Sequence, residues 1–270
     1  MIVEKVILDP KNPEITLTCY IPFDSPENRT PLRKAMLVLP GGGYWGCSDR
    51  EGEPIALAYL GYGYVSFVLR YSIQEKARHP KPLIDASLAM KYIRLNASRF
   101  HIDPKKIFAI GFSAGGHLCG MLATAWKNEE VNKAIDMPYG WNRPAGVVLS
   151  YACLSYDAGP TDLYNYQLRT NTPTDEMKRS VSPADMVDKD SSPMFIWHTS
   201  DDNVVPVKNA IDMAAKLAEA GKRFELHIYP KGAHGISLAD ERTEAGWGGC
   251  FIDPHIAQWF SDSLKWMNTI

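Results

Sequence analysis

Apolar residues along this chain form short continuous runs, and stretches with apolar residues three and four positions apart lie between them. Continuous runs such as 36–39 and 65–69 are typical of central strands in a parallel sheet, where both faces of a strand are covered. The runs predict strands at residues 15–21, 35–39, 64–71, 106–112, 146–151, 194–198 and 224–229.

The stretches with helical spacing predict helices at residues 53–60, 83–97, 114–126, 208–220 and 254–267. Strands that alternate with helices in this way indicate an α/β fold with a doubly wound, mostly parallel central sheet. We find no repeat, linker or low-complexity tract and therefore predict one domain over residues 1–270. Residues 155–190 are polar and proline-containing and are too long for a plain connection, so we expect a small cap-like insertion there.

The composition is ordinary for a globular protein with a substantial core, at 45% hydrophobic and 22% charged residues. A formal net charge of −2 gives no electrostatic reason to expect nucleic acid or an anionic membrane as a partner. Neither a long apolar run nor a signal-peptide pattern is present, so no membrane span is predicted. The five cysteines are scattered without C-x-x-C spacing, which favours free thiols and a cytoplasmic protein.

Residues 107–116, IFAIGFSAGG, carry the most specific chemical motif of the sequence. A predicted buried strand runs into G-x-S-x-G around Ser113 and then into a predicted helix. In this arrangement the serine lies on a sharp turn with its hydroxyl above the sheet, and Gly111 and Gly115 allow the turn to pack closely. The helix N-terminus adds backbone dipoles that favour a developing negative charge. The motif therefore predicts Ser113 as a nucleophile.

A glycine-rich segment, PGGG at residues 40–43, directly follows the predicted strand at 35–39. Consecutive glycines let the backbone fold so that its N–H groups point at a reacting oxygen. Together with the amide of Ala114, these groups are expected to form an oxyanion hole. A phosphate-binding loop is the alternative, but the segment lacks the Lys-Ser/Thr of a P-loop and the spacing of a dinucleotide fingerprint.

The acid and the general base are expected after the nucleophile, in the order serine, acid, histidine. Of the seven histidines, only His234 lies in a loop just past a predicted strand with small neighbours, where a base for Ser113 must stand. Two aspartates, Asp201 and Asp202, follow the preceding predicted strand. Residues 204–206 (VVP) would pack against Asp202 and hold it, so we expect Asp202 to orient the imidazole and Asp201 to be exposed.

With these residues in view, the chain resembles the bacterial esterase/lipase branch of the α/β-hydrolases, and more narrowly the acetyl xylan esterase and feruloyl-esterase-like proteins. The resemblance is carried by residues 40–44, 50–53, 68–71, 100–104, 111–116, 198–206 and 224–235. It implies an α/β-hydrolase fold, aligns the acid with Asp202 and assigns the loop donors to Gly42 and Gly43. Pro40 and Thr199 depart from the family's usual histidine and glycine, and neither change removes a catalytic group.

Several aromatic and apolar residues near these motifs are candidates for the substrate pocket: Tyr44, Trp45, Tyr151, Leu154 and Trp247. Core packing is the alternative for each of them. The expected cap supplies further rings that are able to stack on a sugar: Tyr156, Tyr164 and Tyr166. Arg50 and Glu51 follow the glycine loop and either brace it by a salt bridge or form an ordinary charged helix start.

These residues predict a serine esterase that works through an acyl-enzyme intermediate, and the resemblance points to acetyl groups on xylo-oligosaccharides or related glycosides. We expect no cofactor, no metal ion, and a small-molecule or oligosaccharide ester as the partner; a homo-oligomer stays open. A general small-ester carboxylesterase and a peptidase or amidase on the same scaffold are the alternatives. A non-enzymatic relative would have lost a triad residue, and none is missing.

Overall fold

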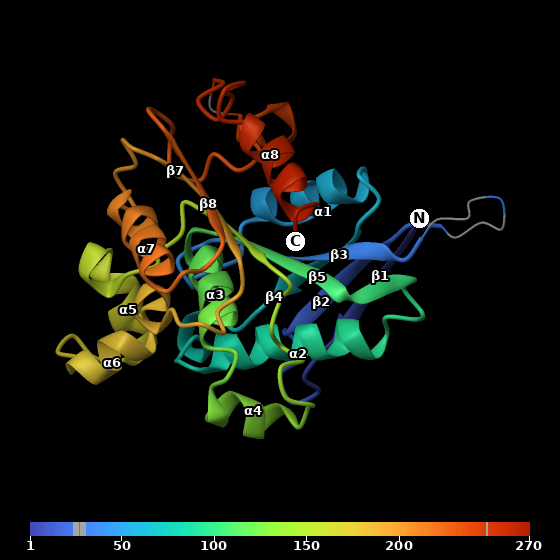
Figure 1. Ribbon diagram of the computed structural model, residues 1–270, viewed down its shortest axis with the longest axis horizontal. Helices are drawn as coiled ribbons and strands as arrows, with labels where there is room; N and C mark the ends of the chain where they lie inside the picture. Colours follow the sequence, from blue (N-terminus) through green and yellow to red (C-terminus); the bar gives the residue numbers. More distant parts are fainter. Residues whose placement is uncertain (24–26, 28–30, 247) are drawn as a thin grey trace.

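The computed structural model describes residues 1–23, 27, 31–246 and 248–270, and these form an eight-stranded sheet with helices on both faces (Figure 1). In spatial order the strands are β1 (Ile2–Ile7), β2 (Thr16–Ile21), β4 (Val65–Arg70), β3 (Arg33–Leu39), β5 (Ile102–Phe112), β6 (Val147–Ser150), β7 (Met194–Thr199) and β8 (Phe224–Tyr229). β2 pairs antiparallel with β1 and β4, and the strands from β4 to β8 pair in parallel. The mostly parallel α/β sheet predicted from the sequence is confirmed.

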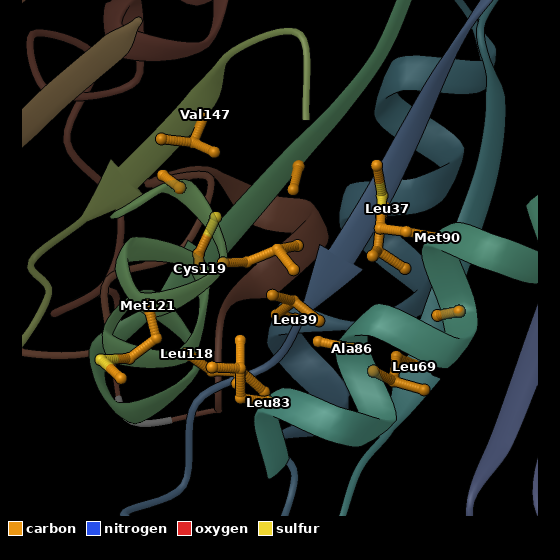
Figure 2. Packing of buried hydrophobic residues seen from close by; sticks show 14 of the residues in the cluster. Leu37, Leu39, Leu69, Leu83, Ala86, Met90, Leu118, Cys119, Met121 and Val147 are labelled. Atoms are coloured by element: carbon orange, nitrogen blue, oxygen red, sulfur yellow. The ribbon is translucent and has the colours of Figure 1, made fainter. Parts of the chain in front are cut away.

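The α-helices are α1 (Glu53–Leu60), α2 (Lys81–Leu95), α3 (Ser113–Thr124), α4 (Glu129–Ile135), α5 (Thr161–Leu168), α6 (Asp175–Ser180), α7 (Lys208–Glu219) and α8 (Gln258–Met267). Leu37 and Leu39 of β3 pack into the hydrophobic layer under α2, α3 and α7, and Figure 2 shows the part of this layer formed with α2 and α3. Met36 and Val38 point the other way, into a layer closed by α1 and α8. Because both faces are covered, the central strands appear in the sequence as continuous apolar runs.

Three elements differ from the prediction for physical reasons. β1 was not predicted. It is an edge strand whose side chains at Ile2, Val3 and Ile7 are exposed, so its sequence lacks the continuous apolar run of a buried strand. β5 begins at Ile102 rather than at residue 106, since its first part pairs with Arg33 before the apolar run starts. α4 was also not predicted; it is short and has only two buried side chains.

Residues 155–190, all of them described, lie between β6 and β7 as α5, α6 and two 3₁₀ helices, η3 (Tyr156–Ala158) and η4 (Pro183–Met186). They pack through a separate small hydrophobic cluster that includes Cys153, Tyr164 and Val205. This cluster joins the segment to the loops that follow β6 and β7. The expected insertion is therefore a helical layer placed at the ends of the strands that carry the site.

Candidate active site

The turn between β5 and α3 has no connecting residue, because β5 ends at Phe112 and α3 begins at Ser113. Ser113 has φ +50°, a left-handed conformation that is strained for a residue with a side chain. A Cβ on Gly111 would lie 2.1 Å from the Gly115 carbonyl oxygen, and one on Gly115 would lie 2.1 Å from the Leu39 carbonyl oxygen. The two glycines of the motif are therefore required by close backbone packing around the half-buried Ser113.

The structure brings Ser113, His234 and Asp202 into one hydrogen-bonded chain. His234 Nε2 lies 2.9 Å from Ser113 Oγ, and His234 Nδ1 lies 2.7 Å from Asp202 Oδ2. The three residues follow β5, β8 and β7, whose carboxyl ends meet at the same edge of the sheet. With an ionised Asp202, Nδ1 of His234 donates to the carboxylate and Nε2 is free to accept the Ser113 proton.

Asp202 is buried and is surrounded by donors. Its Oδ1 accepts hydrogen bonds from the amides of Val204 and Val205, each at 2.9 Å, and His198 Nε2 lies 3.4 Å from its Oδ2. Burial raises the pKa of this carboxyl, but the hydrogen bonds from His198 and His234, the charge of His234 and the Val205 amide outweigh burial and lower the pKa below its ordinary value. Asp202 therefore stays ionised beside His234 over the neutral pH range.

Asp201 lies on the outside of the same turn. Its side chain is exposed, and its Oδ1 accepts a hydrogen bond from the Gly232 amide at 2.9 Å. The structure therefore separates the two neighbouring aspartates as expected, with Asp202 toward His234 and Asp201 toward solvent.

The glycine loop lies beside Ser113. Gly42 and Gly43 have φ +128° and +62°, and both line the same cavity as Ser113. In the described part of the chain, the amides of Gly42, Gly43 and Ala114 donate no hydrogen bond to another protein group. Three free donors near the nucleophile form an arrangement that is able to bind an oxyanion.

Side chains from distant elements hold this loop in place. Tyr71 Oη donates to the Pro40 carbonyl at 2.5 Å, and the Gly41 amide donates to Glu51 Oε2 at 2.8 Å. Glu51 also accepts a hydrogen bond from Tyr151 Oη at 2.6 Å. Of the two roles left open by the sequence, Glu51 thus braces the loop, through a backbone amide.

Arg50 lies beside Glu51 but is directed to another segment. Its Nε donates to the Thr243 carbonyl at 2.6 Å, and its guanidinium lies over the Phe251 ring at 4.1 Å. Arg50 and Glu51 belong to a 3₁₀ helix, η1 (Asp49–Glu51), just before α1. Arg50 thus connects this short helix to the loop that follows His234.

A cavity of about 940 Å³ opens over Ser113 and His234. The remaining lining residues come from the glycine loop, from α5 and from the loops after β6, β7 and β8: Gly42, Gly43, Trp45, Ser48, Arg50, Glu51, Cys153, Pro160, Asp162, Leu163, Asn165, Tyr166, Arg169, Thr170, Asn171, Val204, Val205 and Gly235. Trp45 lines the cavity as expected and is 63% exposed. Its ring centroid lies 4.7 Å from that of Tyr166 on α5.

The predicted pocket roles of Tyr44, Tyr151 and Leu154 are wrong, because these side chains are fully buried and do not line the cavity. Tyr44 Oη bonds to His117 Nδ1 at 2.7 Å, and Tyr151 bonds to Glu51. Both tyrosines have positive φ, +63° and +36°, so the backbone turns their side chains inward. The residue types alone do not reveal that turn.

Of the tyrosines expected to face a sugar, only Tyr166 lines the cavity; Tyr156 and Tyr164 are buried within the helical layer, in its small hydrophobic cluster. Trp247 lies outside the described residues. The polar lining residues Asn165 and Arg169 were missed by the sequence analysis. Arg169, the residue just after α5, follows Tyr166 by three positions and Asn165 by four, which is the spacing that identifies one face of a helix.

Comparison with known proteins assigns this chain to a family. The model of the BD-FAE family matches residues 21–217. The chain belongs to the BD-FAE family. Endo-1,4-beta-xylanase B of Butyrivibrio fibrisolvens is 37% identical to it over 80% of this chain, which spans about a third (34%) of that curated relative.

Solved structures resemble this BD-FAE chain over its whole length. MGS-M1, an α/β-hydrolase from a deep-sea metagenome library of the Medee basin, is 38% identical, with a TM-score of 0.82 over 100% of this chain and 97% of that one. An acetyl ester-xyloside bifunctional hydrolase from Caldicellulosiruptor lactoaceticus is 32% identical, with a TM-score of 0.78 over 97% and 90% of the two chains. Further matches are named acetylxylan esterase, esterase and carboxylesterase. The α/β-hydrolase fold is confirmed, and the matches support carboxylic ester hydrolysis as the reaction class.

The described residues of this BD-FAE chain contain no group of three or more His, Cys, Asp or Glu side chains placed to hold a metal ion. They also contain no helix that combines the length and the apolar character needed to cross a membrane.

Proposed function

We propose that this chain is a serine esterase that removes short acyl groups, above all acetyl, from xylo-oligosaccharides or related glycosides. The observation that carries the proposal is the hydrogen-bonded chain from Ser113 through His234 to Asp202, which opens into a cavity lined by Gly42 and Gly43.

In the first half of the reaction, Ser113 Oγ attacks the ester carbonyl carbon while His234 Nε2 accepts the hydroxyl proton. Asp202 holds the imidazole through Nδ1 and stabilises the imidazolium that forms. His234 then gives the proton to the departing alcohol oxygen, which leaves an acetyl group on Ser113.

In the second half, His234 takes a proton from water, and the hydroxide attacks the acyl-enzyme carbonyl. Both tetrahedral intermediates place negative charge on the former carbonyl oxygen. The amides of Gly42, Gly43 and Ala114 would receive that oxygen, and one such donor typically stabilises the transition state by about 3–4 kcal/mol. Collapse of the second intermediate releases the acid and restores the Ser113 hydroxyl.

The cavity wall supports a carbohydrate as the alcohol part of the substrate. Trp45 and Tyr166 present a pair of rings, and the guanidinium of Arg169 lies over the Tyr166 ring at 4.2 Å. Asp162 and Asn165 add polar groups from the same helix. Apolar ring faces beside a few polar groups suit a sugar ring and its hydroxyls. The names of the xyloside hydrolase and the acetylxylan esterase among the matches agree with this substrate class.

A substrate series tests this proposal. We expect kcat/KM to fall from acetyl to butyryl p-nitrophenyl esters and to be poor for hexanoyl and longer chains, in graded steps, because each methylene changes binding by about 1–3 kcal/mol. We expect acetate release from acetylated xylo-oligosaccharides. Trp45→Ala should raise KM for these fragments about 3- to 10-fold, from the loss of ring stacking, and should change p-nitrophenyl acetate hydrolysis little.

Tyr139→Ala is the matched control for Trp45→Ala, because Tyr139 is an exposed aromatic residue whose ring contacts Trp126 and does not line the cavity. It should leave both substrates unaffected. A preference for octanoyl esters with no acetate released from the fragments would contradict the glycoside assignment and favour a general carboxylesterase.

The nucleophile can be identified by chemical modification. We expect EDTA to leave activity unchanged, since His234 alone activates the Ser113 hydroxyl in this mechanism. A serine-reactive fluorophosphonate should abolish activity and add its mass to the peptide that carries Ser113, while Ser113→Ala should remain unlabelled. Loss of activity with EDTA and recovery with zinc would contradict the mechanism.

A further inference from the structure

Glu51 is a second buried carboxylate in the wall of the catalytic cavity, and the steps above do not use it. It comes from the short helix before α1, is 4% exposed and lines the cavity together with Ser113 and His234. A buried carboxylate is costly unless its oxygens are paired, so its contacts indicate why it is there.

Both oxygens of Glu51 act as acceptors. The Gly41 amide donates to Oε2 at 2.8 Å, and Tyr151 Oη donates to Oε1 at 2.6 Å. Tyr151 Oη itself accepts a hydrogen bond from the Ser237 amide at 3.1 Å, so its own proton is directed at Glu51. Two donors on two oxygens are the pattern of an ionised carboxylate.

These contacts join the two loops on which the reaction depends. On one side, Glu51 holds Gly41, the residue before the two proposed oxyanion donors. On the other side, it holds Tyr151, which binds the loop after β8 at Ser237 and packs its ring edge-to-face on His234, with ring centroids 5.1 Å apart. One side chain therefore spans from the glycine loop to the base.

We infer that Glu51 is a positioning residue, which holds the oxyanion loop and, through Tyr151, the His234 loop in one arrangement, and whose charge favours the imidazolium. This inference rests on the proposed function. The packing agrees with it: a Cβ added to Gly41 would lie 2.6 Å from Glu51 Oε2, so the loop and the carboxylate fit each other without spare room.

The electrostatic surroundings decide the direction of the pH effect. The titratable and charged groups near Glu51 are Arg50 on the same helix, Tyr71 after β4, Tyr151 after β6 and His234 after β8. His234 itself faces Asp202, Ser113 and Tyr151, and Asp202 also faces His198 and Cys153. Burial is the largest influence and raises the pKa of Glu51 above its ordinary value. The hydrogen bonds from Tyr151 and Gly41 and the charges of His234 and Arg50 act in the opposite direction.

Glu51→Gln should lower kcat on the order of 10- to 100-fold with little change in KM, less than the loss of a direct oxyanion donor, because Glu51 acts through its neighbours. The carboxamide keeps one acceptor oxygen and turns an NH₂ toward the second donor, so one of the two links breaks. The substitution also removes a negative charge from the surroundings of the His234 imidazole. The acid limb of the kcat/KM profile should therefore move to lower pH, since a less negative site binds the proton more weakly.

Tyr151→Phe tests the same path without changing the charge of Glu51. It removes the donor to Glu51 and the acceptor for Ser237, so kcat should fall by a similar factor. The double variant should lose less than the product of the two single losses, because both act on one link.

Glu53→Gln is the matched control. Glu53 lies two residues further along and also accepts a tyrosine hydroxyl, that of Tyr20 at 2.9 Å, but it lines a different groove away from Ser113. Its kcat and pH profile should equal those of the wild type. Tyr20→Phe provides the corresponding control for Tyr151→Phe.

The measurements are kcat and KM for p-nitrophenyl acetate between about pH 4 and 9, across the ionisation range of histidine and carboxyl groups, with thermal unfolding of each variant. Wild-type kcat and an unshifted acid limb in folded Glu51→Gln, even with a lowered Tm, would reduce Glu51 to a structural role and overturn the inference. If Glu51→Gln does not fold, folded Tyr151→Phe with wild-type kcat overturns it. Activity retained by Ser113→Ala would instead refute the proposed function itself.

Discussion

We expect Ser113→Ala and His234→Ala each to lower kcat for acetyl ester hydrolysis by roughly 10³-fold or more while the protein stays folded. Without the hydroxyl no acyl-enzyme forms, and without the imidazole no group at 2.9 Å from Oγ accepts its proton. The double variant should be little slower than either single one, because the two residues act as a unit. Residual hydrolysis would come from the free amides of the glycine loop acting on bound ester.

The measurement is kcat for p-nitrophenyl acetate, with circular dichroism and thermal unfolding as controls for folding. Alanine at position 113 keeps a Cβ in the same left-handed turn, so the backbone conformation (φ +50°) costs about the same as with serine. A folded single variant that retains more than a tenth of the wild-type kcat would contradict the assignment of Ser113 and His234.

Asp202→Asn should lower kcat on the order of 10⁴-fold, through the tautomer of His234. The Val204 and Val205 amides both donate to Oδ1, so the carbonyl oxygen of an asparagine must occupy that position. Its NH₂ then faces His234 Nδ1, which has to accept. The ring proton moves to Nε2, and a protonated Nε2 donates to Ser113 Oγ when it should take the proton from it.

Asp201→Asn is the matched control and should change kcat less than about twofold, as expected for an exposed side chain away from the reacting atoms. The asparagine oxygen can still accept the Gly232 amide, so the turn keeps its hydrogen bond. The two variants differ by one position in the chain and make the same chemical change. A large loss with Asp201→Asn and little with Asp202→Asn would reverse the assignment of the acid.

The sequence by itself determined those parts of the protein that depend on neighbouring residues. Continuous apolar runs identified central strands such as β3 and β4, because a strand covered on both faces must be apolar on both. G-x-S-x-G located the sharp turn at Ser113, since a Cβ at Gly111 or Gly115 would lie 2.1 Å from a carbonyl oxygen and only glycine fits there. Chain order and loop position selected His234, and the apolar segment at residues 204–206 together with the family resemblance selected Asp202 over Asp201. The structure places Asp202 and His234 within hydrogen-bond distance of each other.

Only the tertiary structure decided which side chains face the cavity and what holds the loops around it. Tyr44 and Tyr151, both with positive φ, are buried while Trp45 is exposed, and residue type does not determine this difference. Glu51 meets Tyr151 across 100 positions of the chain, and no local pattern records such a contact. Hydrophobic periodicity shows which face of a helix or strand is buried. Which distant residue a side chain contacts depends on how the ends of separate strands converge in the folded sheet.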